Sequence, residues 1–476
     1  MADSHCERLS ALDQSFLELE SHNAHMHVAS ISLYEAGPLA TPGGGIAIDR
    51  IRAVFEHALT LVPRYRQKLV WSPVFHHPLW IDDRHFNLNY HLRHTHLPKP
   101  GDERQLKRLA GRLFSQALDR GKPLWETTVV EGVEGNRFAV ISKMHHCMLD
   151  GASGSELSGT TMRPTPELDP ELEKPVPKWV PRPTPSPSKL FFGELAHRAQ
   201  APLVAFGALR RAATHPWQTT NALLDVTGGL REALITGMRP ASPTPLNIDI
   251  GPHRRFDYLD TDLGMVKHVK AALGGTINDV VLAVLSGALR RFLRQRGLGV
   301  EKLDFRAMIP VNVRVRGDTS LGNQVAMLVA RLPLDEREPC ERLARVITET
   351  RALKGSHQAD AIRVIEEIGD WTSPALLAQS TRVAARTRPF NIVVTNVPGP
   401  PMRLYMAGAA MLGAYPAVPL YQNQALGVAL FSYAGHLCWG FHADWDAVPD
   451  LHNVVEAVAG ELTTLAEIAA APLQPH

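Results

Sequence analysis

The first 160 residues alternate between two hydrophobic periods. Residues 27–33 (HVASISL) alternate apolar and polar side chains, which is typical of a strand with one buried face. Residues 48–61 carry apolar side chains at helical spacing, and Pro63 follows, so we expect a helix that ends before this proline. Residues 105–118 show the same helical period. This part of the chain therefore mixes strands with helices.

A β-hairpin is expected between residues 127 and 144. Residues 127–131 and 137–144 both have strand-like patterns. The polar stretch 132–136 (GVEGN) between them contains the glycines and asparagine that tight turns prefer. The second strand then runs directly into two consecutive histidines, which places them at a strand end.

The composition changes sharply at residue 163. Residues 163–188 are rich in proline, which supports neither helices nor strand ladders, so we expect an extended linker. Residues 189–239 then mix apolar and basic side chains at helical spacing. Two interpretations stay open for them, namely helices that pack on a domain or a surface that contacts lipid. We favour packing, because most amphipathic helices are half-buried.

The second half repeats the mixture of strands and helices. Residues 276–296 carry the clearest helical pattern of the chain, with apolar side chains on one broad face. Thr276 and Asp279 have the spacing of a capping box, arginines cluster in the last turns, and Gly297 ends the helix. The strands expected after it lie at residues 305–310, 325–332, 392–395 and 426–433.

Length and pattern together predict two domains of mixed α/β fold class. A chain of 476 residues is too long for one ordinary core. The two halves share the same mixed pattern, which favours two related α/β units. We expect an N-terminal domain at 1–162, a proline-rich linker with a helical connection at 163–246, and a C-terminal domain at 247–476.

Composition and charge exclude several function classes. With 50 Lys and Arg against 48 Asp and Glu, the net charge of +2 gives no basic field for nucleic acid. The four cysteines are scattered, so we expect neither a zinc site nor a disulfide framework. The charged N-terminus does not resemble a signal peptide, and no apolar stretch reaches the ~20 residues of a membrane-spanning helix. We therefore expect a cytoplasmic protein, with at most peripheral contact to the inner membrane or lipid inclusions.

The candidate chemistry lies in residues 145–151 (HHCMLDG). A histidine has an ordinary pKa of about 6.5, so it is a competent general base near neutral pH. Asp150 is followed by Gly151, and a glycine turn permits this acid to fold back towards an imidazole or a distant arginine. Residues 76–83 (HHPLWIDD) also place two histidines before acids, but without a glycine turn. Spacing alone favours 145–151 only modestly over this second pair, which we interpret as a surface or strand-end feature.

The heptapeptide HHCMLDG matches HHxxxDG, the signature of the CoA-dependent acyltransferase superfamily. Four further segments agree in order along the chain: LSALD at 9–13, PLW at 123–125, GTINDVVLA at 275–283 and TNVPGP at 395–400. Together the five motifs resemble those of the bacterial wax ester synthase/diacylglycerol acyltransferase family. The resemblance covers nearly the whole chain, and its second half lacks another HHxxxDG copy, so one catalytic site is implied.

This resemblance implies two chloramphenicol-acetyltransferase-like α/β domains with a tunnel at their interface. It also implies an O-acyltransferase that moves a long-chain acyl group from acyl-CoA to diacylglycerol, giving triacylglycerol, or to a fatty alcohol, giving a wax ester. His146 would be the general base and His145 a supporting residue, while Cys147 is expected to be a buried filler. Acyl-CoA would be a substrate, and neither a cofactor nor a metal is expected. The residues that bind CoA are not assigned.

The resemblance also gives Asp150 a role as a structural clamp, together with Gly151. In the superfamily this acid commonly pairs with an arginine of the first domain. Arg66 is the candidate for this arginine here, with Arg64 as the alternative.

Three more residues are expected to support the site. Asn278 and Asp279 begin the helix at 276–296, where the helix dipole favours an acid. The family marks this pair as relevant to activity, and we expect support rather than direct chemistry. Trp125 is expected to position the hairpin by packing and to line the cleft. Residues 395–400 are expected to form a rigid turn that frames the domain interface.

Two alternative functions stay open. A condensation-type acyltransferase would take its acyl group from a carrier, but we expect no fused carrier domain and the motifs are of the lipid type. A non-catalytic protein of the lipid-droplet surface would carry a degenerate motif, whereas HHxxxDG is intact at 145–151. The choice between diacylglycerol and alcohol depends on tunnel width, which the sequence does not set.

Overall fold

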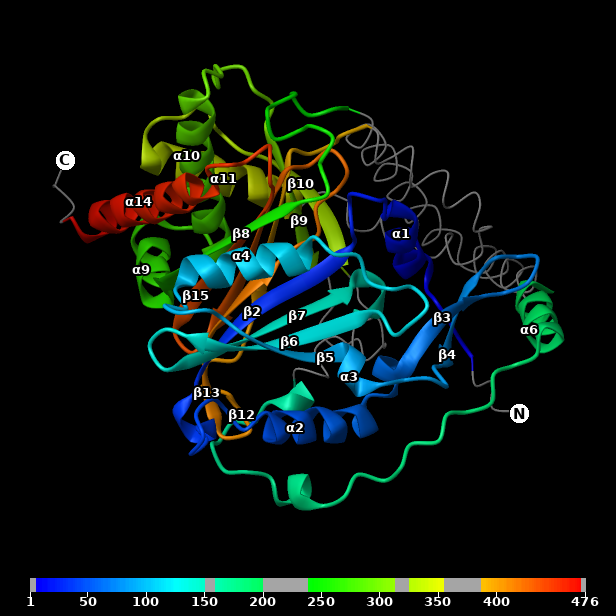
Figure 1. The fold of residues 1–476 in the computed structure, drawn as a ribbon. Helices are drawn as coiled ribbons and strands as arrows, with labels where there is room; N and C mark the ends of the chain where they lie inside the picture. Colours follow the sequence, from blue (N-terminus) through cyan, green and yellow to red (C-terminus); the bar gives the residue numbers. More distant parts are fainter. Residues whose placement is uncertain (1–5, 150–158, 200–238, 313–324, 355–386, 472–476) are drawn as a thin grey trace, which may run out of the picture.

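In the part of the chain that the structure describes, two six-stranded sheets and one three-stranded sheet are covered by helices (Figure 1). This mixed architecture agrees with the fold class that the sequence predicts. The computed structural model describes residues 6–149, 159–199, 239–312, 325–354 and 387–471.

The first six-stranded sheet carries most of the N-terminal half. In sheet order its strands are β12 (Tyr405–Met406), β13 (Ala409–Ala417), β2 (His27–Glu35), β7 (Arg137–His145), β6 (Trp125–Val133) and β5 (Leu92–His96). The predicted hairpin is confirmed, since β6 and β7 pair antiparallel. β2 also pairs antiparallel with β7, which places His27 opposite His145 at the end of the ladder.

Helices cover both faces of this sheet. α2 (Ile48–Leu61) has the predicted bounds and packs its apolar side on one face. α4 (Glu103–Phe114) packs on the other face and ends before the predicted residue 118, because the chain leaves the helix at its C-cap Ser115. The shorter helical elements of this half are α1 (Ala11–Leu19), α3 (Leu88–His91), η1 (Gly37–Leu39), η2 (Pro63–Arg66) and η3 (His146–Met148).

A small sheet lies at the edge of the N-terminal half. Its order is β1 (Glu7–Arg8), β4 (Pro78–Asp82) and β3 (Gln67–Trp71). The second histidine pair of the sequence belongs to the β3–β4 connection, where His76 is exposed and His77 is buried. This confirms the interpretation of that pair as a strand-end feature.

The second six-stranded sheet carries the C-terminal half. Its strands, in order, are β10 (Val325–Arg331), β9 (Arg306–Asn312), β11 (Ile392–Pro398), β14 (Leu426–Tyr433), β15 (His436–Asp444) and β8 (Arg254–Asp262). The four strands predicted after residue 300 are all present. The helices beside this sheet are α9 (Leu263–Leu273), α10 (Ile277–Gln295), α11 (Pro339–Lys354) and α14 (Leu451–Ala470).

The predicted long helix is α10, and it forms the centre of the larger core. Val284, Leu285 and Leu289 on it are fully buried among residues of the sheet and of α14. Among the described helices, none alone has the length and apolar character that crossing a membrane requires. Only α9 and α10 taken together pass that test, across a bend of 97°.

Each half of the chain contributes elements that pack on the sheet of the other half. β12 and β13 come from the C-terminal half of the chain, but β13 pairs with β2 in the N-terminal sheet. In return, α4 packs against β8, so closely that a Cβ on Gly111 would lie 2.7 Å from the carbonyl oxygen of Arg254. The division expected at residues 162 and 247 does not anticipate this exchange, which ties the two sheets together.

The proline-rich segment runs along the outside of the molecule to α6 (Pro187–Ala199) (Figure 1). Apart from η4 (Pro170–Glu173) and an isolated bridge between Arg163 and Tyr405, residues 163–186 have no helix or strand. The expected extended linker is therefore confirmed up to the start of α6. Of the segment 189–239, residues 200–238 lie outside the described part of the chain.

Candidate active site

The two histidines of HHCMLDG lie where β7 meets η3. His145 is the last residue of β7, and His146 is the first residue of η3. The backbone N–H of His145 donates to the carbonyl oxygen of Leu124 at 2.9 Å, and that of His146 donates to Met26 at 2.8 Å. Neighbouring segments therefore hold both peptide groups, and the predicted strand-end position is confirmed.

His146 packs face to face on Phe16. The ring centroids are 3.8 Å apart and the planes differ by 24°. Phe16 belongs to α1, whose N-cap Ser10 accepts a hydrogen bond from the N–H of Asp13 at 3.1 Å. The LSALD motif thus starts the helix that covers the histidine. Burial lowers the pKa of His146 to about 4, so its ring is neutral at pH 7 and is a weaker base than an ordinary histidine.

His145 has a separate environment. It is fully buried, and its Nδ1 accepts a hydrogen bond from the backbone N–H of Cys147 at 3.1 Å. Its Nε2 lies 3.6 Å from Oε2 of Glu20. The two imidazoles therefore contact different partners, and which of them faces the substrate stays a prediction.

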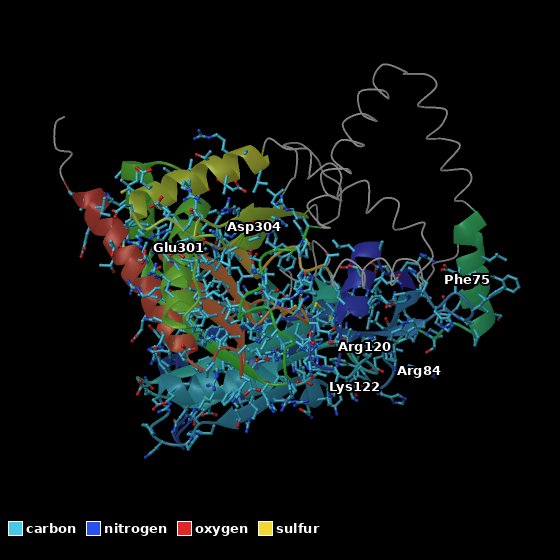
Figure 2. All side chains as sticks on the ribbon, turned by 90° about the horizontal axis from the view of Figure 1, so that it is seen from above. Phe75, Arg84, Arg120, Lys122, Glu301 and Asp304 are labelled. Carbon is cyan, nitrogen blue, oxygen red and sulfur yellow. The ribbon has the colours of Figure 1, made fainter. Side chains whose placement is uncertain are left out.

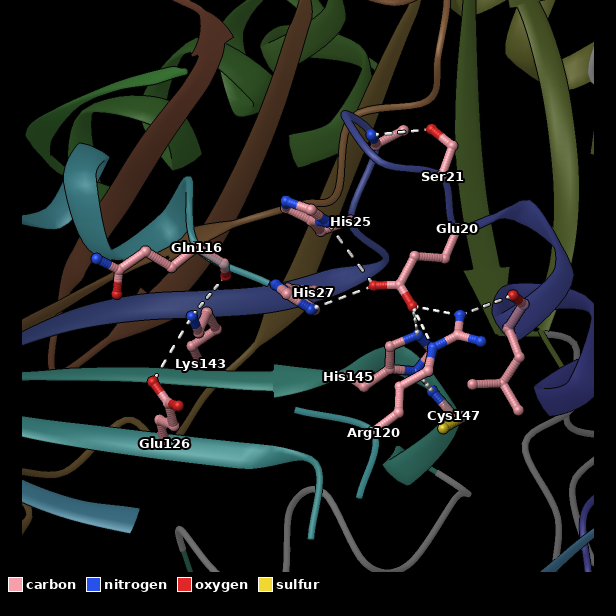
Figure 3. A network of polar contacts seen from close by, with 12 residues as sticks. Glu20, Ser21, His25, His27, Gln116, Arg120, Glu126, Lys143, His145 and Cys147 are labelled. Atoms are coloured by element: carbon pink, nitrogen blue, oxygen red, sulfur yellow. Dashed lines mark hydrogen bonds and ion pairs between the residues drawn. The ribbon is translucent and has the colours of Figure 1, made fainter. Parts of the chain in front are cut away.

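Glu20, at the C-terminal end of α1, was not found from the sequence. Its side chain is only 10% exposed and lies against three histidines and Arg120 (Figure 3). Burial opposes the charge on this carboxylate, but contacts with His145, His27 and Arg120 outweigh burial and hold the pKa of Glu20 far below its usual range. One signal was present in the sequence, since residues 22–27 (HNAHMH) contain three histidines.

The motifs at 275–283 and 395–400 meet in space. Nδ2 of Asn396 donates a hydrogen bond to Oδ1 of Asn278 at 2.7 Å. Asn278 lies in the first turn of α10 and Asn396 near the end of β11. Two segments far apart in the sequence therefore join where a helix of the C-terminal half begins.

Family models match along most of the chain. Residues 9–281 match the wax ester synthase/diacylglycerol acyltransferase catalytic domain, and residues 321–466 match the C-terminal domain of the same family. The chain belongs to the wax ester synthase/diacylglycerol acyltransferase family. The family's catalytic domain includes α1, β7 and η3, the elements that surround the two histidines.

Individual members of the family are similar to this chain over nearly their full length. The O-acyltransferase WSD of Acinetobacter baylyi is 30% identical, across 95% of this chain and 96% of that protein. A putative diacylglycerol O-acyltransferase of Mycobacterium tuberculosis is 33% identical, across 96% and 97%. The solved wax ester synthase/diacylglycerol acyltransferase of Marinobacter aquaeolei VT8 is 25% identical, with a TM-score of 0.67 over 98% of this chain and all of that one. The starter condensation domain of rhizomide synthetase, 13% identical with a TM-score of 0.57, shares the fold.

Cys147 of the family motif is a buried thiol. Its exposed fraction is 1%, and burial raises its pKa well above the usual value. A thiol that stays protonated is a poor nucleophile. This agrees with its expected role as a filler. Within the described ranges, no cluster of three or more His, Cys, Asp and Glu side chains has the arrangement of a metal site.

Trp125 is a packing residue at the start of β6. Its indole N–H donates to the carbonyl oxygen of Tyr65 at 2.8 Å, and its ring stacks on His91 with centroids 4.8 Å apart. It also lines an internal cavity of about 90 Å³ next to Met144 of β7. Trp125 therefore fixes the strand beside β7.

Asp279 closes the N-terminal end of α10. Its Oδ2 accepts hydrogen bonds from the N–H and the hydroxyl of Thr276, and its own N–H donates to that hydroxyl, which completes the predicted capping box. Its Oδ1 accepts a further hydrogen bond from Thr350 of α11 at 2.7 Å. With both oxygens occupied by protein groups, Asp279 is placed to hold α10 rather than to contact a substrate.

The expected pairing of Asp150 with an arginine lies outside the described residues, as does Gly151. Arg66 itself places its guanidinium over the ring of Trp179 in the linker, 4.7 Å from the centroid. Its buried Nε has no hydrogen-bond partner among the described residues. Arg64, the alternative, pairs with Glu7 at 2.6 Å.

Two cavities border the last turn of α1. The larger has a volume of about 650 Å³ and is lined by Glu18, Leu19, Glu20, Ser21, Asn247, Asp249, Arg388, Tyr421, Gln422 and Asn423. The smaller has a volume of about 220 Å³ and is lined by Gln14, Leu17, Glu18, Glu20, Trp71, Pro78 and Arg120. Both halves of the chain line the larger cavity, and Glu20 lines both cavities. A continuous tunnel past His146 stays a prediction.

Proposed function

We propose that this chain transfers a long-chain acyl group from acyl-CoA to the hydroxyl group of diacylglycerol or of a long-chain alcohol, with His146 as general base. The family's catalytic domain at residues 9–281 and the relatives named as O-acyltransferases support the reaction. The observation that carries the assignment of the base is the position of His146 in the family motif, where it begins η3 at the end of β7 and stacks on Phe16.

The proposed reaction moves one proton and one acyl group. The neutral ring accepts the hydroxyl proton while the acceptor oxygen attacks the thioester carbon, which gives a tetrahedral adduct. The adduct collapses, the C–S bond breaks, and the CoA thiolate takes the proton back from the imidazolium. An ester and free CoA result, and His146 is regenerated. The proposed step balances without an added cofactor or metal, and acyl-CoA is a substrate.

The remaining site residues have supporting roles in this proposal. His145 holds the start of η3 through its bond to the Cys147 backbone. Asp150, followed by Gly151, clamps the loop after η3 by pairing with an arginine. Trp125 fixes the hairpin. Asn278 and Asp279 hold the start of α10, which forms part of the wall of the proposed tunnel.

The substrates are tested with radiolabelled palmitoyl-CoA. Incubation of the purified protein with diolein or hexadecanol should give labelled triacylglycerol or labelled wax ester on thin-layer chromatography, and the product ratio ranks the acceptors. A parallel incubation supplies the palmitoyl group on an acyl carrier protein. Ester formed only from the carrier-bound donor would point to the condensation-type alternative, and no ester from any donor would contradict acyl transfer to these alcohols.

We further propose that the cytoplasmic protein contacts the surface of the inner membrane or a lipid inclusion through α6 and the β3–β4 connection. Phe192 and Leu195 of α6 are 64% and 46% exposed, and Val74 is 71% exposed. Phe191 of α6 stacks on Phe75 with centroids 5.8 Å apart, which joins the two segments, and Phe75 lies beside α6 at the end of the molecule (Figure 2). Apolar side chains exposed together are typical of surfaces that meet lipid.

Flotation with vesicles of phosphatidylcholine and phosphatidylglycerol that contain diolein tests this contact. Phe192→Glu combined with Leu195→Glu should reduce the floated fraction about tenfold or more, because each buried apolar side chain contributes about 2 kcal/mol. Ile468→Glu is the matched control, since Ile468 is an exposed apolar residue of α14 at the opposite end of the molecule (Figures 1 and 2). Equal flotation of the wild type and the double variant would contradict the proposed surface.

A further inference from the structure

Four side chains converge on the carboxylate of Glu20 (Figure 3). Nε of Arg120 donates to its Oε2 at 2.9 Å. Nε2 of His145 lies 3.6 Å from the same oxygen, while Nε2 of His27 and Nδ1 of His25 lie 3.5 and 3.9 Å from Oε1. Both oxygens of one carboxylate therefore face protein nitrogens from three separate segments.

The contacts of His145 fix which of its nitrogens carries the proton. Nδ1 accepts the N–H of Cys147, so in the neutral ring the proton is on Nε2. That N–H faces Oε2 of Glu20 at 3.6 Å, beyond hydrogen-bond distance, so the carboxylate attracts it electrostatically. The ring of His145 thus bridges the backbone of η3 and the end of α1. If the ring of His145 flipped by 180°, a ring C–H group would replace Nδ1 opposite the Cys147 N–H.

Arg120 ties the same carboxylate to α1. Its guanidinium donates to Glu20 and also to the carbonyl oxygen of Leu17 at 3.0 Å, in the last turn of the helix. α1 carries Phe16, on which His146 stacks. Glu20 therefore links the helix that covers His146 to the histidine that precedes it in the chain.

We propose that Glu20 is a positioning residue for the reaction, because its carboxylate, held by Arg120, fixes the tautomer and orientation of His145 and thereby the geometry of η3 and His146. This rests on the proposed role of His146 as base. Glu20 takes no proton from the acceptor and forms no bond to the acyl group. It acts through His145, and its loss should displace the base while the substrates still bind.

Glu20→Gln is the decisive variant, since it keeps the shape and removes the charge. A neutral amide attracts Arg120 and His145 less than the carboxylate does, and its NH2 group must replace one of the two oxygens that face protein nitrogens, so the hold on the His145 ring is weakened. We expect kcat to fall about 10–100-fold, because a displacement of about 1 Å at a reacting group costs up to 10²-fold. The KM values for palmitoyl-CoA and for the acceptor should stay within about twofold of wild type.

Glu461→Gln is a matched control for stability. Glu461 of α14 is a similarly buried glutamate, with a 13% exposed side chain, and it pairs with Arg342 behind the second sheet. This variant should lower the urea midpoint without changing kcat. Should both variants reduce kcat in proportion to lost stability, or should Glu20→Gln keep wild-type kcat, the positioning role is wrong. A rise in KM with unchanged kcat would instead make Glu20 a substrate contact.

Two further measurements separate this role from other failures. If Glu20→Gln does not fold, the double variant Glu20→Gln/Arg120→Gln removes the ion pair without leaving one charge alone. This double variant should show the loss of kcat, about 10–100-fold, that is expected for Glu20→Gln. A double variant with wild-type kcat would overturn the proposal. His146→Ala is assayed beside both. If His146→Ala is fully active, the proposed base is wrong, whereas an inactive His146→Ala with an unaffected Glu20→Gln contradicts the positioning role alone.

Discussion

Replacing His146 by alanine is expected to lower kcat by about 10²–10⁴-fold while the protein remains folded. The change removes the only group that this mechanism uses to accept the hydroxyl proton, and general base catalysis contributes about this factor. The backbone bond from His146 to Met26 is retained in the variant, and Phe16 stays in α1. Steady-state kinetics with palmitoyl-CoA and the preferred acceptor measure the loss, and circular dichroism checks the fold.

His76→Ala is the natural control for this variant. It removes one ring of the other histidine pair, which is exposed in the β3–β4 connection. Its kcat should equal that of the wild type. Wild-type activity in His146→Ala would exclude His146 as the base and leave the family's reaction without an assigned proton acceptor in this chain.

Local patterns predicted the elements that build the site. The helical period over 48–61 gave the bounds of α2, and the capping-box spacing of Thr276 and Asp279 gave the start of α10. The hairpin that ends in His145 followed from alternation and from turn residues. In each case the signal is local, because neighbouring residues decide both the hydrogen bonding and the buried face.

Contacts between distant segments were not predictable in the same way. Residues 409–417 (AAMLGAYPA) show no apolar and polar alternation and were not predicted as a strand, and nothing in that pattern says that they pair with β2. The bond between Asn278 and Asn396 likewise requires two motifs to meet across the second half. The family resemblance indicated that these motifs matter, and only the structure shows how they touch.

The position of Glu20 shows why the surroundings of a base are hard to predict. A single acid after a short helix carries no signal of its own. It becomes informative only when the register of β2 against β7 brings His27 and His145 to its side. The sequence therefore identified the histidine pair, while the carboxylate that holds it depended on strand pairing.

Lowering the pH from 7 to 5.5 is expected to reduce the free energy of unfolding by about 2.5 kcal/mol through His27 and His442, and His146, whose pKa is lowered to about 4, adds to this loss. Burial lowers the pKa values of His27 and His442 to about 3, while an unfolded histidine has a pKa of about 6.5. The contribution of these two neutral rings to the free energy of unfolding is therefore complete above pH 6.5. It is lost as the pH falls from 6.5 towards 3. Between pH 7 and pH 5.5 each ring costs about 1.3 kcal/mol, because the unfolded state binds a proton that the folded state does not.

Carboxylates do not account for this loss. Burial opposes the charge on Asp82, but bonds from Arg182 and Gln67 lower its pKa below 3.8, so its contribution disappears only at still lower pH. His442→Asn isolates one of the two rings. The Nδ1–H of His442 donates to the carbonyl oxygen of Val418 at 2.7 Å, and an asparagine amide replaces this donor without titrating.

Urea unfolding at pH 7 and pH 5.5 should therefore show a difference that is about 1.3 kcal/mol smaller in His442→Asn than in wild type. His76→Asn, which removes an exposed ring, should keep the wild-type difference. An unchanged difference in His442→Asn would mean that this ring is not the source of the acid sensitivity. Burial keeps the rings of His146, His27 and His442 neutral at pH 7, and because it resists their protonation it is expected to limit the pH range in which the fold is stable.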